Sequence, residues 1–159
     1  MSAQRLPVVL LTGFLGAGKT TLLNRLLARA DMADTLVIVN EFGEASLDHR
    51  LVTHTADQTV VELASGCVCC TLRGDLAQTL RDAHWRFARA GRRQFERIVI
   101  ETTGLADPAP VVQTFFNDAR LRERYRLDGV VTVVDAVHFD GQFRRERVAA
   151  SQVAFAARL

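Results

Sequence analysis

Lysine is nearly absent from this chain. Of its 159 residues, 20 are basic, and all but one of these are arginine, which leaves Lys19 as the single lysine. A general preference for arginine would give the same count without functional meaning. Lysine is, however, a compact charge on a flexible stem, whereas the guanidinium of arginine is a wide planar fork. A site that requires the narrower cation cannot use arginine, so Lys19 is the first basic residue to place in the fold.

Long apolar segments are also missing. No run approaches the roughly 20 apolar residues that span a bilayer, and the opening segment lacks the small-residue cleavage site of a signal peptide. The formal net charge is only +2, which does not indicate a dedicated nucleic-acid-binding protein. Most basic runs contain acidic or aromatic residues, and we interpret them as solvated helix faces: 92–93, 120–126 and 144–147. We therefore expect neither nucleic acid nor membrane as a partner.

Cysteine is scarce and confined to one tetrapeptide, which contains Cys67, Cys69 and Cys70. An odd, tightly clustered set cannot form a disulfide framework and is typical of a metal or redox site in a reducing compartment, so we expect a cytoplasmic protein. Three thiolates suit a borderline ion such as Zn²⁺, and a tetrahedral site would need a fourth ligand. Such short spacing favours an open, exchangeable site over a closed structural one. The alternative is a set of buried or redox-inert cysteines.

Short apolar runs alternate with longer amphipathic segments along the chain. They predict strands at 6–12, 35–40, 59–63, 97–101 and 129–135, and helices at 19–30, 75–90 and 110–117. This alternation indicates an α/β fold of three layers, in which a mostly parallel sheet has helices on both faces. The length suits one domain, 1–159. Because the last stretch, 148–159, is apolar and has no polar tail, we expect the domain to be incomplete at the C-terminus.

A phosphate-binding pattern, G-x-x-x-x-G-K-[ST], follows the first predicted strand and opens the first predicted helix. Its glycines let backbone N–H groups turn inward around phosphate oxygens, and the helix N-terminus adds partial positive charge. Lys19 would reach the β- and γ-phosphates, and the Thr20 hydroxyl would bind Mg²⁺. The alternative is a glycine-rich turn with a solvated lysine. The predicted nucleotide-binding residues are Gly13, Gly16, Ala17, Gly18, Lys19, Thr20 and Thr21.

An acidic residue at the end of a neighbouring strand is needed to support the Mg²⁺ shell, and Glu101 fits that position. Gly104, three residues later, could present its backbone N–H to the γ-phosphate, as in D-x-x-G switch sequences. We therefore predict a catalytic set of Lys19, Thr20, Glu101 and Gly104. Glu101 could instead cap the following segment, and Asp135 is a rival for the metal role that we interpret mainly as structural.

A second group of carboxylates follows the strand predicted at 35–40. Glu41 and Glu44, with Asp48 further on, could supply oxygen ligands or contact nucleotide-bound Mg²⁺. The alternative is an ordinary acidic surface loop. The four histidines are scattered along the chain, and we interpret each as a surface or satisfied side chain.

Together these motifs resemble the CobW/HypB/UreG family of metal-handling P-loop GTPases, and its CobW-like branch in particular. The segments that carry the resemblance are 13–23, 40–44 with Asp48, 66–70 and 101–108. It implies a P-loop NTPase fold that binds and hydrolyses GTP with Mg²⁺ and delivers Zn²⁺ or Co²⁺ to a client metalloprotein, with a homodimer as one arrangement. It places the cargo metal at Cys67, Cys69 and Cys70. The full set of predicted metal ligands also includes Glu41, and Thr20 as the ligand of Mg²⁺.

The chain departs from the family pattern in several places. Family members continue into an N-K-x-D motif, which reads the guanine base, and into a C-terminal domain; we expect both to be lacking here, where the sequence ends at Leu159. Ala157 stands where an aspartate is usual, and Ser65 where an asparagine is usual. Guanine specificity therefore rests on the resemblance alone. The alternatives are a truncated metal-binding module with weak or no nucleotide hydrolysis, and a small-molecule kinase, whose chemistry has no place for a cysteine triplet.

Overall fold

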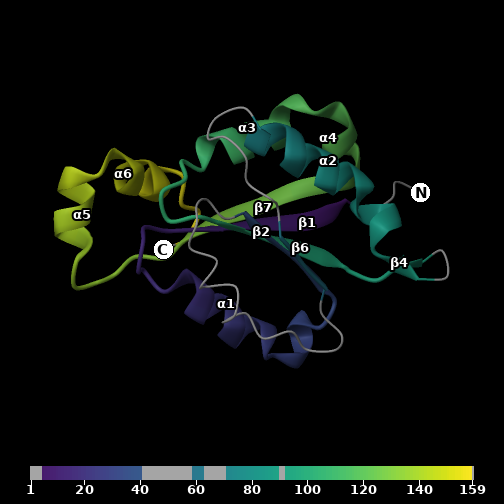
Figure 1. The fold of residues 1–159 in the computed structure, drawn as a ribbon, viewed down its shortest axis with the longest axis horizontal. Helices are drawn as coiled ribbons and strands as arrows, with labels where there is room; N and C mark the ends of the chain where they lie inside the picture. Colours follow the sequence, from purple (N-terminus) through teal and green to yellow (C-terminus); the bar gives the residue numbers. More distant parts are fainter. Residues whose placement is uncertain (1–4, 41–58, 63–70, 90–91, 159) are drawn as a thin grey trace.

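The computed structural model describes residues 5–40, 59–62, 71–89 and 92–158, and a five-stranded parallel sheet lies at its centre (Figure 1). The strand order is β3-β2-β6-β1-β7, and every pairing between neighbours in this sheet is parallel. The strands are β1 (Leu6–Thr12), β2 (Thr35–Asn40), β3 (Thr59–Glu62), β6 (Arg97–Thr102) and β7 (Tyr125–Thr132). The predicted α/β fold is therefore confirmed.

Helices cover both faces of the sheet (Figure 1). One face carries α1 (Lys19–Leu27), and the other carries α2 (Thr71–Arg86), α3 (Ala109–Asn117) and α4 (Ala119–Arg124). Two further helices, α5 (Phe139–Arg145) and α6 (Arg147–Ala154), lie beyond the carboxyl ends of the strands. A short 3-10 helix, η1 (Ala30–Met32), follows α1. Within the part of the chain that is described, no helix combines the length and apolar character of a transmembrane span.

Alternate residues of the central strands supply two separate cores. Leu10 and Ile100 belong to the larger core, under α2, α3 and α4, whereas Leu11 and Val99 belong to the smaller core, under α1. Successive side chains of a strand point to opposite faces, so a strand that is covered on both sides must be apolar throughout. This explains why these strands appear in the sequence as continuous apolar runs rather than as alternating patterns.

Two predicted helices have wrong bounds. The helix expected over 75–90 runs from Thr71 to Arg86 and is followed by a small antiparallel pair, β4 (Ala88–Arg89) and β5 (Arg92–Arg93). Phe87 still packs against the larger core, so the apolar spacing continues after the helix has ended. The helix expected over 19–30 ends at Leu27, because Arg29 adopts an extended conformation before η1 begins.

The arginine runs have mixed outcomes. The arginines of α4 are exposed, as are those of α5 and the first residue of α6, in agreement with solvated helix faces: Arg120, Arg122, Arg124, Arg144, Arg145 and Arg147. The pair at 92–93 is different, because it forms β5 rather than part of a helix. Charge pattern alone does not distinguish a short strand from a helix.

The last predicted strand is displaced towards the N-terminus, since β7 spans Tyr125–Thr132 rather than 129–135. Tyr125 is 1% exposed and its hydroxyl donates to the Leu80 carbonyl at 2.8 Å, which anchors the start of the strand under α2. Asp135 lies in the turn before α5, where its carboxylate accepts the backbone N–H groups of Val137 and His138. The contact with the His138 ring, followed by these backbone hydrogen bonds, lowers the pKa of Asp135. This geometry gives Asp135 a structural role.

The segment after α6 returns to the sheet beside β7. Ala157 and Arg158 both direct their N–H groups at the Val130 carbonyl, at 2.8 and 3.2 Å, and the Arg158 carbonyl accepts from Thr132 at 3.0 Å. Arg158 thus forms a parallel bridge with Val131. These contacts fix α6 beside the carboxyl end of β7.

Candidate nucleotide site at the carboxyl edge of the sheet

The loop between β1 and α1 is built on glycines with positive φ. Gly13, Gly16 and Gly18 have φ values of 142°, 75° and 95°. A β-carbon on Gly13 would lie 2.2 Å from the Val133 carbonyl oxygen, so this position also excludes a side chain by space. Gly18 caps α1 in the left-handed conformation and brings no side chain to accept the first N–H groups of the helix. The helix N-terminus therefore retains donors for an anionic ligand.

Lys19 bends back over this loop and is 9% exposed. Its Nζ donates to the backbone carbonyls of Gly13 at 2.9 Å and Phe14 at 3.2 Å. The ammonium is thus held inside the turn, among main-chain groups of the predicted phosphate loop. A compact ammonium suits this position, where two backbone carbonyls converge on one nitrogen, better than the wide planar fork of a guanidinium.

Thr20 and Glu101 meet although they are 81 residues apart, since the Thr20 Oγ1 donates to the Glu101 Oε1 at 3.1 Å. The parallel pairing of β1 with β6 sets Leu11 opposite Glu101 and so brings the carboxylate to the phosphate loop. Glu101 is 6% exposed. Hydroxyl and carboxylate oxygens are ligands that Mg²⁺ prefers, so this donor pair fits the predicted metal.

Gly104 lies in the turn after β6 and packs directly on the phosphate loop. A β-carbon on Gly104 would lie 2.6 Å from the backbone nitrogen of Leu15 and 2.8 Å from its Cα. Any side chain here would force one of the two loops to move. The structure therefore brings all four predicted catalytic residues to one edge of the sheet: Lys19, Thr20, Glu101 and Gly104.

The predicted cargo-metal residues lie outside the described residues: Glu41, Cys67, Cys69 and Cys70, together with Glu44 and Asp48. The strands before these segments, β2 and β3, end at residues 40 and 62, on the same edge as β6, because Val39 is paired with both Glu62 and Glu101. Among the residues that are described, no group of three or more His, Cys, Asp or Glu side chains could hold a metal ion.

Sequence reasoning missed one residue that contacts this edge. Gln152 of α6 is 1% exposed, and its Nε2 donates to the carbonyls of Gly104 and Ala106, at 3.1 Å each. It contacts Gly104 across 48 residues of sequence. The sequence signal was that Gln152 opens the segment 152–156, which resembles a later segment of the family, but this likeness does not by itself identify a partner.

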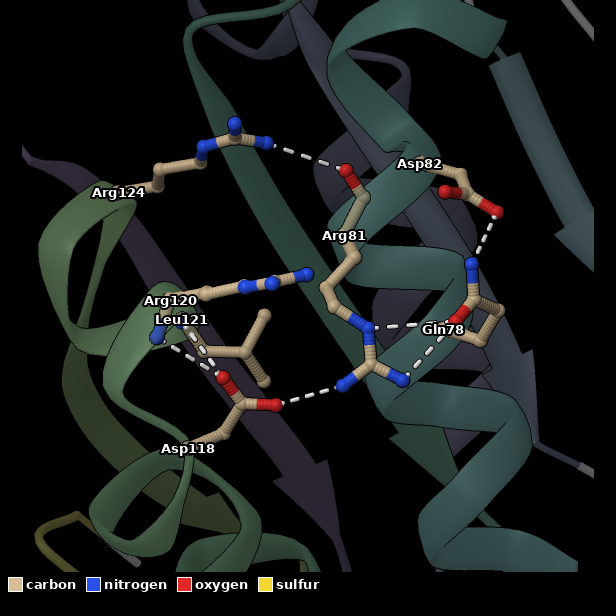
Figure 2. A network of polar contacts seen from close by, with 7 residues as sticks. All are labelled: Gln78, Arg81, Asp82, Asp118, Arg120, Leu121 and Arg124. Carbon is tan, nitrogen blue, oxygen red and sulfur yellow. Dashed lines mark hydrogen bonds and ion pairs between the residues drawn. The ribbon is translucent and has the colours of Figure 1, made fainter.

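A second polar network, away from this edge, joins α2 to α4 (Figure 2). The Arg81 Nη1 lies 2.6 Å from the Asp118 Oδ2, and Arg124 donates to the Arg81 carbonyl at 3.2 Å. The other Asp118 oxygen accepts the N–H groups of Arg120 and Leu121 and so caps α4. Partial burial acts to raise the pKa of Asp118, but the Leu121 N–H and the Arg81 guanidinium outweigh it and hold that pKa below its usual range.

An open depression of about 570 Å³ adjoins this network, lined by residues that include Ala77, Gln113 and Arg120. The guanidinium at its side, Arg81, is already paired with Asp118 and Gln78 (Figure 2). An arginine neutralised in this way has less to offer an anion, so the carboxyl edge of the sheet is the better candidate site.

Comparison with known proteins agrees with this assignment. A family model described as the CobW/HypB/UreG nucleotide-binding domain matches residues 7–159. The chain is 48% identical over 152 residues to the zinc chaperone YjiA of Escherichia coli K12, and the aligned region covers 96% of this chain and 47% of YjiA. It is 39% identical over 145 residues to the zinc-regulated GTPase metalloprotein activator 1 of Schizosaccharomyces pombe, with 88% and 34% covered.

Solved structures give the same picture. A Zn(II)-bound YjiA GTPase from E. coli superposes with a TM-score of 0.65 at 34% identity, over 97% of this chain and 48% of that one. A Zn(II)-bound triple mutant of the YjiA GTPase gives 0.67 at 39% identity. The chain spans about half the length of YjiA and less of the activator. With the family model matched from residue 7 to the last residue, the chain belongs to the CobW/HypB/UreG nucleotide-binding domain family.

Proposed function

We propose that this chain is the nucleotide-binding part of a GTPase metallochaperone, which hydrolyses GTP with Mg²⁺ and couples hydrolysis to the binding and delivery of zinc to a client metalloprotein. One observation carries the nucleotide half of the proposal. The phosphate loop encloses the Lys19 ammonium while the Thr20 hydroxyl contacts the Glu101 carboxylate beside it. The GTPases among its relatives support the choice of nucleotide.

Each residue of the edge has a distinct role in this proposal. The Lys19 ammonium exchanges its backbone carbonyl acceptors for phosphate oxygens, while the N–H groups of the loop, from Gly13, Gly16, Ala17 and Gly18 to Thr21, surround the phosphate chain. Thr20 and Glu101 would hold Mg²⁺, which neutralises charge that develops on the phosphate oxygens. Gly104 donates its N–H to the γ-phosphate. No strong base is assigned to the attacking water, so we expect slow intrinsic turnover.

The cargo half of the proposal rests on Cys67, Cys69 and Cys70, with Glu41 as a further ligand. Their thiolates match the preference of Zn²⁺, and two relatives are named zinc chaperones: YjiA and, at 42% identity over 140 residues, CobW of Pseudomonas aeruginosa. Zinc is thus favoured over cobalt as the cargo. We place this activity in the cytoplasm. Its partners are GTP and the client metalloprotein, with a homodimer as one arrangement, and we expect neither nucleic acid nor membrane as a partner.

The nucleotide proposal is tested by Mg²⁺-dependent GTP hydrolysis in the intact protein. Lys19→Ala is expected to reduce turnover about 100-fold, because it removes a charged donor from the developing phosphate charge. Arg25→Ala is the matched control, since it removes an exposed cation from the same helix and should leave turnover unchanged. Turnover by Lys19→Ala equal to that of the wild type would refute the proposal.

The cargo proposal is tested by zinc stoichiometry after replacing Cys67, Cys69 and Cys70 together with serine. The variant should lose the bound zinc while its GTP affinity stays the same, and cobalt offered at equal concentration should compete poorly with zinc. Zinc stoichiometry that survives the triple replacement would show that the cysteines are not the site. Tight zinc binding by a wild type that binds no GTP would favour the alternative of a metal-binding module.

A further inference from the structure

The amide of Gln152 is a buried polar group that the roles assigned above do not use. Its nitrogen bridges two carbonyls, those of Gly104 and Ala106, at 3.1 Å each. Both carbonyls belong to the turn that follows β6, and the first belongs to the residue that presents its N–H to the γ-phosphate in the proposed function. A side chain 1% exposed cannot exchange these acceptors for water without moving the helix.

Gln152 is itself fixed to the sheet. Its backbone carbonyl accepts the Thr132 hydroxyl at 2.8 Å, and Thr132, the last residue of β7, is 1% exposed. The neighbouring Ser151 hydroxyl donates to the Asp107 carboxylate at 2.9 Å, and the same oxygen accepts the backbone N–H of Ala109. Helix α6 therefore holds the turn at two places while remaining tied to the strand beside the phosphate loop.

The turn has little freedom on its other side. Gly104 packs against the Leu15 backbone so closely that a β-carbon would lie 2.6 Å from its nitrogen. Leu15 lies within the phosphate loop, between Gly13 and Gly16. The Gly104 residue is thus confined between the phosphate loop and the Gln152 amide. The N–H and the carbonyl of Gly104 are separated by φ and ψ of this one residue. The Leu15 contact on one side and the Gln152 hydrogen bond on the other together narrow the values that these dihedrals can take.

We propose that Gln152 is a positioning residue for γ-phosphate recognition: its amide holds the Gly104 backbone so that the N–H points to the place of the γ-phosphate. This inference rests on the proposed function. It makes α6 part of the device that distinguishes GTP from GDP, since GDP uses the phosphate loop but not Gly104. By linkage, a γ-phosphate bound at Gly104 stabilises the contact between α6 and the turn.

The test compares the affinities of GDP and of a non-hydrolysable GTP analogue, each with Mg²⁺, in the intact protein. Gln152→Met keeps the unbranched shape and removes both N–H donors. It is expected to weaken binding of the analogue about 10-fold, the effect of one or two lost hydrogen bonds, and to leave GDP within about two-fold of the wild type. Gln142→Met, the same change in α5, is the matched control and should alter neither affinity.

A second variant tests the donor chemistry of the amide directly. Gln152→Glu keeps the size of the side chain but sets a carboxylate against two carbonyl oxygens, so it should reduce the preference for the analogue over GDP at least as much. Equal weakening of both nucleotides, or an unchanged preference in folded variants, would show that Gln152 is only structural. A wild type that binds neither nucleotide would overturn the proposed function and this inference together, whereas tight, Lys19-dependent binding with an unchanged preference would overturn this inference alone.

Discussion

Two polar networks of this molecule each join residues far apart in sequence, yet they are built differently. At the carboxyl edge, Thr20 contacts Glu101 while Lys19 donates to carbonyls of its own loop. Between α2 and α4, Arg81 is paired with Asp118, and that carboxylate also caps a helix (Figure 2). In the first network glycines with positive φ shape the backbone around a buried cation, whereas in the second ordinary helices present side chains that satisfy one another.

This difference indicates that the two networks have different roles. An ammonium held by backbone carbonyls can exchange them for stronger anionic acceptors, such as phosphate oxygens. A guanidinium already held by a carboxylate gains less from an external anion, and the carboxylate adds stability by capping α4. Substitutions at the carboxyl edge should therefore change ligand binding with little effect on stability, and substitutions at the α2–α4 network should do the reverse.

Gly104→Ala should have a large effect, and that effect should be a loss of GTP turnover. The added β-carbon meets the Leu15 backbone, so the turn and the phosphate loop must separate, and displacement of a reacting group by about 1 Å can cost about 100-fold in turnover. We expect GTP hydrolysis to fall by about that factor in steady-state assays. Gly141→Ala in α5 is the matched control, because nothing lies within 4 Å of its added β-carbon. Equal losses in the two variants would show that the turn after β6 has no special role.

Asp118→Ala should lower the stability of the fold. It removes the cap from the N–H groups of Arg120 and Leu121, and urea unfolding should show a loss of about 1–2 kcal/mol in the free energy of unfolding. Arg81→Ala breaks the partly exposed ion pair and the exposed hydrogen bonds to Gln78, and should cost about 0–1 kcal/mol. GTP turnover per folded molecule should be unchanged in both. A larger loss in Arg81→Ala than in Asp118→Ala would contradict the assigned importance of the cap.

His84, which also lies in α2, should have the smallest effect, a change in how stability depends on pH. Burial, with contributions from Arg93 and Arg124, lowers the pKa of His84 below 6.5. The centroid of its ring lies 6.2 Å from that of Phe95 and 6.0 Å from that of Tyr125. The folded state thus favours the neutral ring, so this contribution to stability is complete above pH 6.5 and is lost as the pH falls below it.

Unfolding curves between about pH 5 and pH 8 test this expectation, since that is the range in which histidine titrates. The wild type should lose more stability on acidification than His84→Gln does. Parallel pH profiles for the two proteins would show that burial of this ring is not felt in the folding equilibrium.

The comparison also shows what sequence could predict and what it could not. The phosphate loop and the Glu101–Gly104 segment were predictable because each is a contiguous motif at the end of an apolar strand, and parallel pairing brings such ends together. The ends of α2 and β7 were not, because Phe87 keeps the helical spacing beyond the helix and Tyr125 begins the strand through a contact with Leu80. The bridge from Gln152 to Gly104 depends on tertiary packing across 48 residues, which no local pattern encodes.

We expect the carboxyl edge to bind GTP and the α2–α4 network to maintain the fold. A calorimetric titration of GTP with Mg²⁺ into two variants side by side, Lys19→Ala and Asp118→Ala, separates these two roles. Lys19→Ala should weaken GTP binding about 100-fold, and Asp118→Ala should stay within about two-fold of the wild type. Wild-type affinity in Lys19→Ala, or an equal loss in both variants, would show that the two networks do not divide the roles in this way.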